Sequence, residues 1–280
     1  MNKLIVFQSD FGLVDGAVSA MHGVANVVDD SLKIYDLTHD IPQYSIWEAS
    51  YRLYQTTEYW PKGTVFVSVV DPGVGSSRLS VVARTVNGHY IVTPDNGTLT
   101  HLKKYVGLSD VREIDETKHR RDDTEYSYTF HGRDVYANTG AKLASGAISF
   151  EQVGEKVELS KVMELEVGDV LRESGSVKGT IDILDVRFGS LWTNIPRDVF
   201  VSTGFKHGDT VEVLIRNGTK TAYNNRIIYG RSFADVYPSE QIIYVNSVYN
   251  MAIAINQGNF AKAYNIGTGQ HWEIEFKKID

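Results

Sequence analysis

The sequence predicts an N-terminal α/β layered domain with a central, mostly parallel sheet, followed by a smaller all-β, barrel-like domain. In the first half, continuous apolar runs typical of buried parallel strands alternate with helical patterns. From about Gly175, short strand-like segments follow one another with almost no helical period. A length of 280 residues suits two domains at ~150 residues each. We expect them at 1–165 and 175–280, with the boundary between 160 and 176.

Local signals predict the elements of the first domain. Ser45 and Glu48 have the spacing of a capping box, which starts a helix. Asn87-Gly88 is the dipeptide of a type I′ turn, which joins two strands as a hairpin. Gly146 is placed to end a helix. The expected order is strand 4–8, helix 16–28, strand 32–37, helix 45–57, strand 64–70, the hairpin and helix 132–145.

The second domain is expected to consist of strands joined by turns such as Asn217-Gly218. No internal repeat or low-complexity segment interrupts this pattern. The strand-like segments are GTIDILDV, TVEVLIRN, AYNNRIIYG, QIIYVNS, MAIAINQ and HWEIEF.

The composition excludes several classes of protein. Without cysteine, the chain has no disulfide, Cys-ligated zinc, iron–sulfur cluster or thiol nucleophile. A net charge of −7 with dispersed basic residues argues against a partner such as duplex DNA. The basic run 119–121 is followed at once by acidic residues, which predicts a solvated loop. The start MNKLIVFQSDFG lacks a signal peptide's apolar region, and no run reaches the ~18 apolar residues of a membrane span, so we expect a cytoplasmic protein.

Three polar residues mark a candidate site, because ligands of open α/β sheets bind beyond the carboxyl ends of the strands. Asp10 follows the first strand, Asp71 follows strand 64–70, and His131 precedes the helix at 132–145. Each alone has a structural explanation, since strand-end Asp residues often form turns or caps. Together they come from distant segments and are expected to meet at one edge of the sheet.

Familiar catalytic motifs are absent. The sequence DPGVG lacks the third glycine of a dinucleotide fingerprint, and there is no P-loop, H-E-x-x-H or G-x-S-x-G. No two histidines fall at a recognised ligand spacing, so we predict no metal site. The residues considered as ligands were His22, Asp36, His39, Asp40, His131 and Asp134.

Six separated motifs, in order from residue 4 to beyond 260, carry a family resemblance. They are SDFG at 9–12 with Asp15, DPGVGSSR at 71–78, TPDNG at 93–97, FHGRD at 130–134, DVRFGSLWTNI at 185–195 and YVNS at 244–247. The chain resembles the S-adenosylmethionine (SAM) hydroxide adenosyltransferases, SAM hydrolases related to the bacterial fluorinase and chlorinase.

The resemblance implies an α/β domain and a β-barrel domain, assembled as homotrimers with active sites between neighbouring subunits. It implies that SAM and water become adenosine and methionine, with SAM as substrate and no cofactor. The family's catalytic trio matches Asp71, Arg78 and His131, and its ribose-binding carboxylate matches Asp10. Asp15 is expected either to help hold the sugar or to cap the following helix.

Further residues of the resemblance concern the nucleoside and methionine parts of the substrate. Asp185 and Ser190 match positions that contact methionine and adenine, and Ser247 and Asn256-Gln257 match a loop on the nucleoside side. Two aromatic residues offer surfaces for adenine or for the sulfonium, with core packing as the alternative. These are Tyr44 and Trp192.

The halogenating relatives differ from this chain at diagnostic positions. They lack an Asp at the position of Asp71, and the fluorinase has Ser where this chain has Gly132 and a long insertion where it has Asn87-Gly88. These differences favour a hydrolase over a halogenase. Val248 stands where the fluorinase has a carboxylate-binding Arg, which leaves recognition of the methionine carboxylate open.

The chemistry of these residues fits hydrolysis, because sulfonium is a good leaving group and the scarce component is the nucleophile. Arg78 is expected to keep Asp71 ionised, and either His131 or Asp71 accepts the proton of the attacking water. Two other functions are the alternatives. A non-catalytic adenosine or SAM sensor would not need a water-activating trio, and a metal-dependent phosphoesterase would lose activity in EDTA.

Overall fold

The computed structural model describes residues 2–279 as two compact units, the first ending at Leu165 and the second beginning at Glu166. The elements of the first unit are β1 (Leu4–Ser9), α1 (Ala17–Val28), β2 (Lys33–Thr38), α2 (Ile46–Thr57), β3 (Val65–Val69), β4 (Ser80–Thr85), β5 (Tyr90–Pro94), α3 (Thr100–Tyr105), β6 (Leu108–Glu113), α4 (Glu116–His119), η1 (Gly132–Ala137), α5 (Asn138–Ser145), η2 (Phe150–Gln152) and η3 (Leu159–Lys161).

The sheet of the first unit is mixed, with strand order β2-β1-β3-β5-β4-β6. β1 pairs in parallel with β2 and β3, and β3 with β5. β4 is antiparallel to both β5 and β6. The expectation of a mostly parallel sheet is therefore only partly right. The reason is the hairpin at Asn87-Gly88, which joins this sheet and must run antiparallel.

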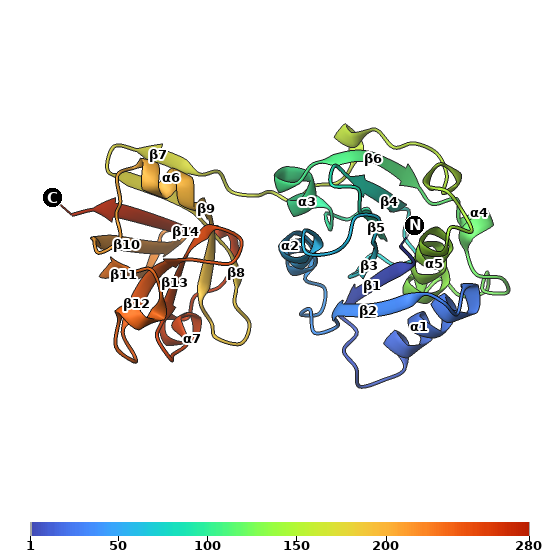
Figure 1. The fold of residues 1–280 in the computed structure, drawn as a ribbon, viewed down its shortest axis with the longest axis horizontal. Coiled ribbons are helices and arrows are strands. Elements are labelled where there is room, and N and C mark those ends of the chain that lie inside the picture. The colour runs from blue at the N-terminus through green and yellow to red at the C-terminus, as the bar shows by residue number, and fades with distance from the viewer. Residues whose placement is uncertain (1, 280) are drawn as a thin grey trace. The chain divides into compact units, whose positions relative to one another are not determined.

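Helices cover both faces of the sheet, with α1 and α5 on one side and α2 and α3 on the other (Figure 1). The strand residues alternate accordingly. Ile5 and Phe7 of β1 pack in the core that contains Met21 of α1, whereas Val6 packs with Leu53 of α2. Because both faces are covered, polar groups that bind a ligand are left to the ends of the strands.

The local signals are largely confirmed, with one correction. Ser45 caps α2 by accepting a hydrogen bond from the Glu48 N–H, and Gly146 ends α5 in the left-handed conformation at φ +83°. In the hairpin, Gly88 has a φ of +86° but Asn87 has no positive φ. The predicted type I′ turn is wrong, because that turn needs positive φ at both central residues.

The second unit is a closed barrel in which β8, β9, β13, β12, β11, β10 and β14 pair in turn and β14 returns to β8. β7 extends the sheet beside β8. Two short α-helices and one 3-10 helix lie among the described residues of this unit, so the expectation of an all-β domain is corrected to a barrel with helical connections. The elements are β7 (Leu171–Glu173), β8 (Ser176–Leu184), β9 (Leu191–Pro196), α6 (Arg197–Ser202), β10 (Thr210–Asn217), β11 (Lys220–Tyr229), η4 (Phe233–Asp235), β12 (Gln241–Val245), β13 (Asn250–Ile255), α7 (Phe260–Tyr264) and β14 (Gly269–Lys278).

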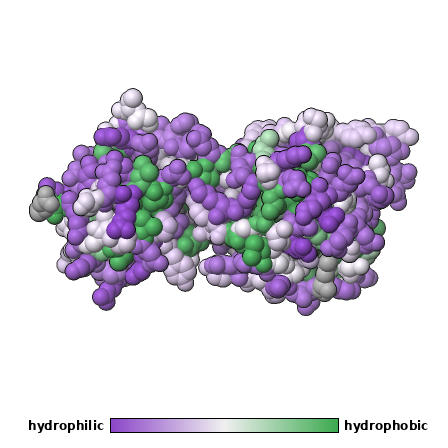
Figure 2. Space-filling model, turned by 90° about the horizontal axis from the view of Figure 1, so that it is seen from above, coloured by the Kyte–Doolittle hydropathy of each residue, from purple (hydrophilic) through white to green (hydrophobic). Residues whose placement is uncertain are grey.

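The visible surface is largely polar. Hydrophilic residues dominate the face shown in Figure 2, and hydrophobic residues show in smaller groups on each unit. Within residues 2–279, none of the helices combines the length and the apolar character needed to cross a membrane.

Candidate functional site

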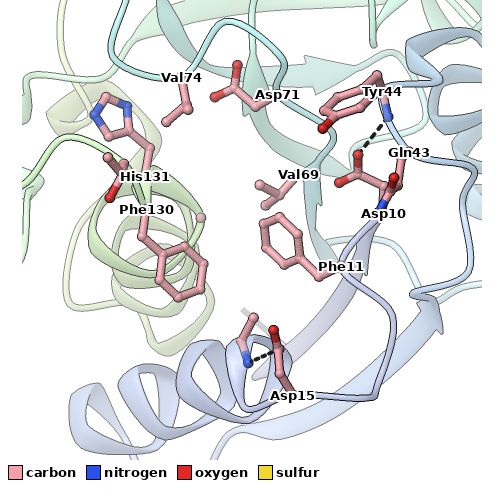
Figure 3. A pocket seen from close by; sticks show the side chains of 13 residues that line it. Asp10, Phe11, Asp15, Gln43, Tyr44, Val69, Asp71, Val74, Phe130 and His131 are labelled. Atoms are coloured by element: carbon pink, nitrogen blue, oxygen red, sulfur yellow. Dashed lines mark hydrogen bonds between the residues drawn. The ribbon is translucent and has the colours of Figure 1, made fainter.

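A pocket of about 320 Å³ lies in the first unit, where β1 and β3 end and the helix at Gly132 begins. Figure 3 shows the labelled residues around the cavity, on these separate segments. The structure thus brings Asp10, Asp71 and His131 into one pocket. Its lining consists of Asp10, Phe11, Asp15, Ala17, Gln43, Tyr44, Val69, Asp71, Val74, Thr129, Phe130, His131 and Gly132.

Asp10 and Tyr44 form one side of the pocket (Figure 3). The Asp10 Oδ2 accepts the backbone N–H of Tyr44 at 2.8 Å. Tyr44 has a φ of +67°, which is rare for a bulky residue, and it is 69% exposed. Core packing is therefore wrong for Tyr44. A strained backbone that holds an aromatic ring in solvent beside a pocket is typical of a ligand-binding position.

Asp15 stands at the start of α1 and also lines the pocket. Its Oδ1 accepts the N–H of Ala17, the first residue of α1, at 2.9 Å, although the N-cap residue of that helix is Gly16. The other carboxylate oxygen has no role in that hydrogen bond. Asp15 therefore fixes the first turn of α1 at the edge of the pocket.

Asp71 and Arg78 form a bidentate ion pair beside the pocket. The Arg78 Nε donates to Asp71 Oδ1 at 2.7 Å, and Nη2 donates to Oδ2. The side chains are only 5% and 9% exposed, respectively. A planar guanidinium that contacts both carboxylate oxygens fixes the orientation of the carboxylate as well as its charge.

His131 lies between two guanidinium groups. Its Nδ1 is 3.2 Å from Arg78 Nη2, and its Nε2 is 2.9 Å from Arg120 Nη2. A neutral imidazole accepts one of these N–H groups, whereas an imidazolium accepts neither. Burial lowers the pKa of His131 below its ordinary value of 6.5; the Arg120 and Arg78 charges lower it further, against opposing effects of Glu116 and Asp71. Burial and the two neighbouring cations thus favour the neutral form of His131.

Arg120 is a residue that the sequence interpretation missed. Its side chain is 10% exposed, donates to Glu116 Oε2 at 2.9 Å and lies over the Tyr128 ring. His119 is also buried, and only Arg121 of the basic run is exposed. The predicted solvated loop is therefore wrong for two of three residues. The i,i+4 spacing of Glu116 and Arg120 was the one local signal, and that spacing is common on solvent-exposed helices.

Five residues close a continuous chain of polar contacts behind the pocket, which we call the polar ring. Arg78 Nη1 donates to Ser80 Oγ at 3.2 Å, and Ser80 Oγ donates to Glu116 Oε1 at 2.9 Å. Glu116 accepts a hydrogen bond from Arg120. Arg120 and Arg78 each contact one ring nitrogen of His131. Removing any member leaves a partner with an unmatched polar group, so the ring acts as one positioning unit.

Four of the predicted substrate residues of the second unit gather at one end of its barrel. Asp185 and Ser190 bracket the turn between β8 and β9, where the Asp185 N–H donates to the Ser190 carbonyl at 2.9 Å. Asn256 and Gln257 follow β13, whose last residues pair with the start of β9. The Asn256 amide is engaged, because its Nδ2 donates to two backbone carbonyls at 2.9 and 3.1 Å.

The other two predicted residues of this unit lie elsewhere. Ser247 is in the turn between β12 and β13, at the opposite end of β13 from Asn256. Trp192 is buried, and its Nε1 donates to Tyr244 Oη at 3.2 Å. Within this unit Trp192 is therefore packed among other residues, as the alternative of core packing predicts.

Comparison with known proteins gives a consistent result over nearly the whole chain. A curated (R)-S-adenosyl-L-methionine hydrolase of Methanocaldococcus jannaschii is 34% identical, covering 76% of this chain and 74% of the relative. The protein of the same name from Salinispora tropica is 31% identical over 96% and 97%. A fluorinase of Actinopolyspora mzabensis is 25% identical over 95% of each chain.

The fold has a solved counterpart. The crystal structure of an uncharacterized conserved protein from Thermotoga maritima superimposes with a TM-score of 0.88 at 33% identity, covering 98% of this chain and 100% of that one. Residues 5–154 match the SAM hydroxide adenosyltransferase N-terminal domain, and residues 179–273 match the C-terminal domain. The chain therefore belongs to the SAM hydroxide adenosyltransferase family.

Proposed function

We propose that this protein hydrolyses SAM to adenosine and methionine by direct attack of water at C5′. One observation carries the proposal: Asp71 lines the same pocket as Asp10 and the exposed Tyr44 ring. Asp71 also forms a buried ion pair with Arg78, and Arg78 contacts His131. The names of the hydrolase relatives support it, and they specify the R form of SAM.

The surroundings of Asp71 suit a reaction between a nucleophile and a sulfonium cation. In the attack, the oxygen of water bonds to C5′ while the C5′–S bond breaks and its electron pair stays on sulfur. The sulfur loses its positive charge while the oxygen gives up a proton, so charge disappears from the reacting atoms. A site that excludes water therefore favours the transition state, because water would stabilise the charged starting state. The apolar side chains of Val69, Val74 and Phe130 line this part of the pocket.

Asp71 is the proposed acceptor of the water's proton. Both ring nitrogens of His131 face guanidinium N–H groups, so protonating His131 would remove its one acceptor nitrogen and leave donors facing donors at both contacts. The Asp71 oxygens keep lone pairs beyond those used by Arg78, and Asp71 lines the pocket. His131 and Arg78 then act as positioning residues that hold the carboxylate at the attacking water.

Asp10 is proposed to bind the ribose. A carboxylate accepts one hydrogen bond from each of two vicinal hydroxyls. We expect 2′-deoxyadenosine to bind the wild type about 10- to 150-fold more weakly than adenosine, since a hydrogen bond to a charged group contributes about 1.5–3 kcal/mol. With Asp10→Ala this difference should shrink to near unity in calorimetric titrations. An undiminished preference for adenosine in Asp10→Ala would place the ribose elsewhere.

Arg120 is proposed to keep His131 neutral and oriented. Arg120→Gln removes one of the cations that lower the pKa of His131, so that pKa rises and the imidazolium persists to higher pH. We expect kcat to fall about 10- to 100-fold, and the acidic limb of the pH profile of kcat/KM to move to higher pH. Exposed Arg121→Gln is the matched control. A lower kcat with an unmoved acidic limb would show that Arg120 acts on structure alone.

Product analysis separates hydrolysis from the sensor alternative. Purified protein is incubated with each sulfur epimer of SAM in halide-free buffer, and nucleosides are quantified by HPLC and mass spectrometry. Hydrolysis gives equal amounts of adenosine and methionine, with preference for the R epimer. If SAM stays intact while adenosine or SAM binds tightly, the protein is a sensor and the proposal fails.

The fluorinase relatives do not change this proposal. A side chain at Gly132 would place its Cβ 3.1 Å from Val69 Cγ1 and 3.3 Å from Phe130 Cε2, so the serine of the fluorinase would be crowded here. Asp71 is present as well, as in the hydrolases. These two positions support water rather than halide as the nucleophile.

The homotrimer implied by the family resemblance is part of the same proposal. Two observations support the homotrimer. The residues that line the pocket belong to the first unit, whereas six predicted substrate residues belong to the second unit. Sedimentation and activity measured over a dilution series test it. A fully active monomer would contradict it.

A further inference from the structure

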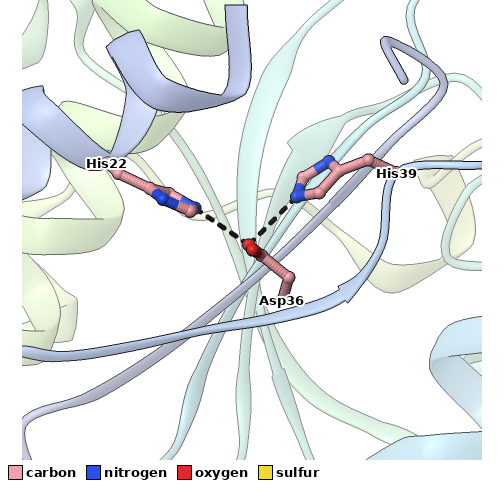
Figure 4. Close-up of side chains that lie close together, drawn as sticks. All are labelled: His22, Asp36 and His39. Carbon is pink, nitrogen blue, oxygen red and sulfur yellow. Dashed lines mark hydrogen bonds and ion pairs between the residues drawn. The ribbon is translucent and has the colours of Figure 1, made fainter. Parts of the chain in front are cut away.

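Three metal-ligating side chains meet in the first unit, outside the lining of the pocket (Figure 4). His22 comes from α1, Asp36 from β2, and His39 from the segment after β2. The Nε2 atoms of His22 and His39 lie 2.8 and 3.0 Å from the same oxygen, Asp36 Oδ1. The three ligand atoms all lie within 4.8 Å of one another.

The sequence predicted no metal site because no histidine pair has a ligand spacing. His22 is fourteen residues before Asp36, and His39 is three residues after it. Two of these side chains are thus brought together by the parallel pairing of β1 with β2 and the packing of α1, not by local spacing. Tertiary structure therefore supplies what the sequence pattern does not show.

The donor set has a defined preference. Two imidazole nitrogens and one carboxylate oxygen suit borderline divalent transition metals such as Zn²⁺, Co²⁺ and Ni²⁺, rather than Ca²⁺ or Mg²⁺. With metal–ligand bonds of about 2.1 Å, adjacent ligands of an octahedral ion lie about 3.0 Å apart. The observed N–O separations of 2.8 and 3.0 Å match that edge, and the two Nε2 atoms lie within 4.8 Å of each other.

The buried histidine has the support expected of a ligand. His39 Nδ1 is 2.7 Å from Ser9 Oγ, and that oxygen also accepts the Phe11 N–H at 3.2 Å. A partner on the second ring nitrogen fixes the ring and directs Nε2 to the ion, as ligating histidines require. His22 and Asp36 are partly exposed, which leaves a path for the ion and room for water ligands.

We propose that His22, Asp36 and His39 form a binding site for one divalent transition-metal ion that stabilises the first unit. The ion takes the place of the protons on the two Nε2 atoms, and the Asp36 carboxylate supplies the negative charge. It links α1 to the end of β2 and, through Ser9, to the end of β1 beside Asp10. Because the site does not line the pocket, its effect is on stability and not on turnover.

The test uses the full-length protein stripped of metal with a chelator and passed into chelator-free buffer. Zn²⁺ is titrated by calorimetry, and Co²⁺ by its visible absorption. We expect one ion per chain and a rise in Tm of about 5 °C at 100-fold Kd. His22→Gln keeps a polar side chain near Asp36 but should bind at least about tenfold more weakly. His271→Gln, at an exposed histidine of the second unit, should bind like the wild type.

Each variant is compared with its own metal-free form, so a change in intrinsic stability does not obscure the result. Equal Zn²⁺ affinity in wild type and His22→Gln, or no Zn²⁺-induced rise in the wild-type Tm, would overturn the proposal. So would SAM turnover that requires Zn²⁺ and is lost in His22→Gln, because the ion would then be catalytic. The binding measurements involve no SAM, so they stand or fall independently of the hydrolase proposal.

Discussion

Asp71→Asn is expected to lower the kcat of SAM hydrolysis by about 10²- to 10⁴-fold. The amide keeps the shape of the carboxylate but cannot accept the proton of the attacking water. Adenosine affinity should stay near that of the wild type, because Asp10 and Tyr44, which form another side of the pocket, are unchanged. Single-turnover kinetics give the first quantity, and calorimetric titration with adenosine gives the second.

Two comparisons make this result specific. Asp30→Asn, at an exposed aspartate outside the pocket, should leave both kcat and adenosine affinity unchanged. His131→Ala should retain more activity than Asp71→Asn, since His131 positions the carboxylate and does not itself accept the proton. If His131→Ala were inactive while Asp71→Asn remained active, His131 would be the base and the assignment to Asp71 would be wrong.

Arg78→Met is expected to destabilise the first unit by about 3–5 kcal/mol, in addition to abolishing turnover. The reason is that Asp71, 5% exposed, would be left as a buried charge without its partner. The same change opens the polar ring, because Arg78 contacts both Ser80 and His131. Urea unfolding followed by circular dichroism measures the loss as a lower midpoint at unchanged slope.

The double variant Asp71→Asn with Arg78→Met separates the ion pair from packing. Removing both charges should restore much of the stability lost in Arg78→Met, while hydrolysis stays absent. A loss below about 1 kcal/mol in Arg78→Met would mean that the pair behaves as an exposed surface salt bridge. That outcome would contradict the buried, oriented carboxylate on which the mechanism depends.

The general arrangement could be predicted because strand ends are marked by local sequence. Apolar runs give the strands, and Asp10 and Asp71 follow two of them directly, so a shared pocket follows from the rule for parallel strands. The same signals could not give the sheet order. The Asn87-Gly88 signal predicts that β4 and β5 form a hairpin, but it does not show that β5 pairs with β3 and so places this hairpin in the same sheet as the parallel strands.

The supporting residues could not be predicted because tertiary packing places them. Arg120 lies among charged neighbours, a pattern of solvated loops, yet α4 turns its side chain onto His131. His22 and Asp36 are fourteen residues apart and meet only after α1 packs against the sheet. In both cases the residue type was visible in the sequence, and the partner was not.

The most direct test of the mechanism is the position of the oxygen from water in the product. Wild-type protein is incubated with SAM in ¹⁸O water, and adenosine and methionine are analysed by mass spectrometry with fragmentation of the nucleoside. Attack at C5′ predicts adenosine with one ¹⁸O atom at its 5′ oxygen and unlabelled methionine. Adenosine without ¹⁸O, or label found in the methionine fragment instead, would contradict the attack of water at C5′.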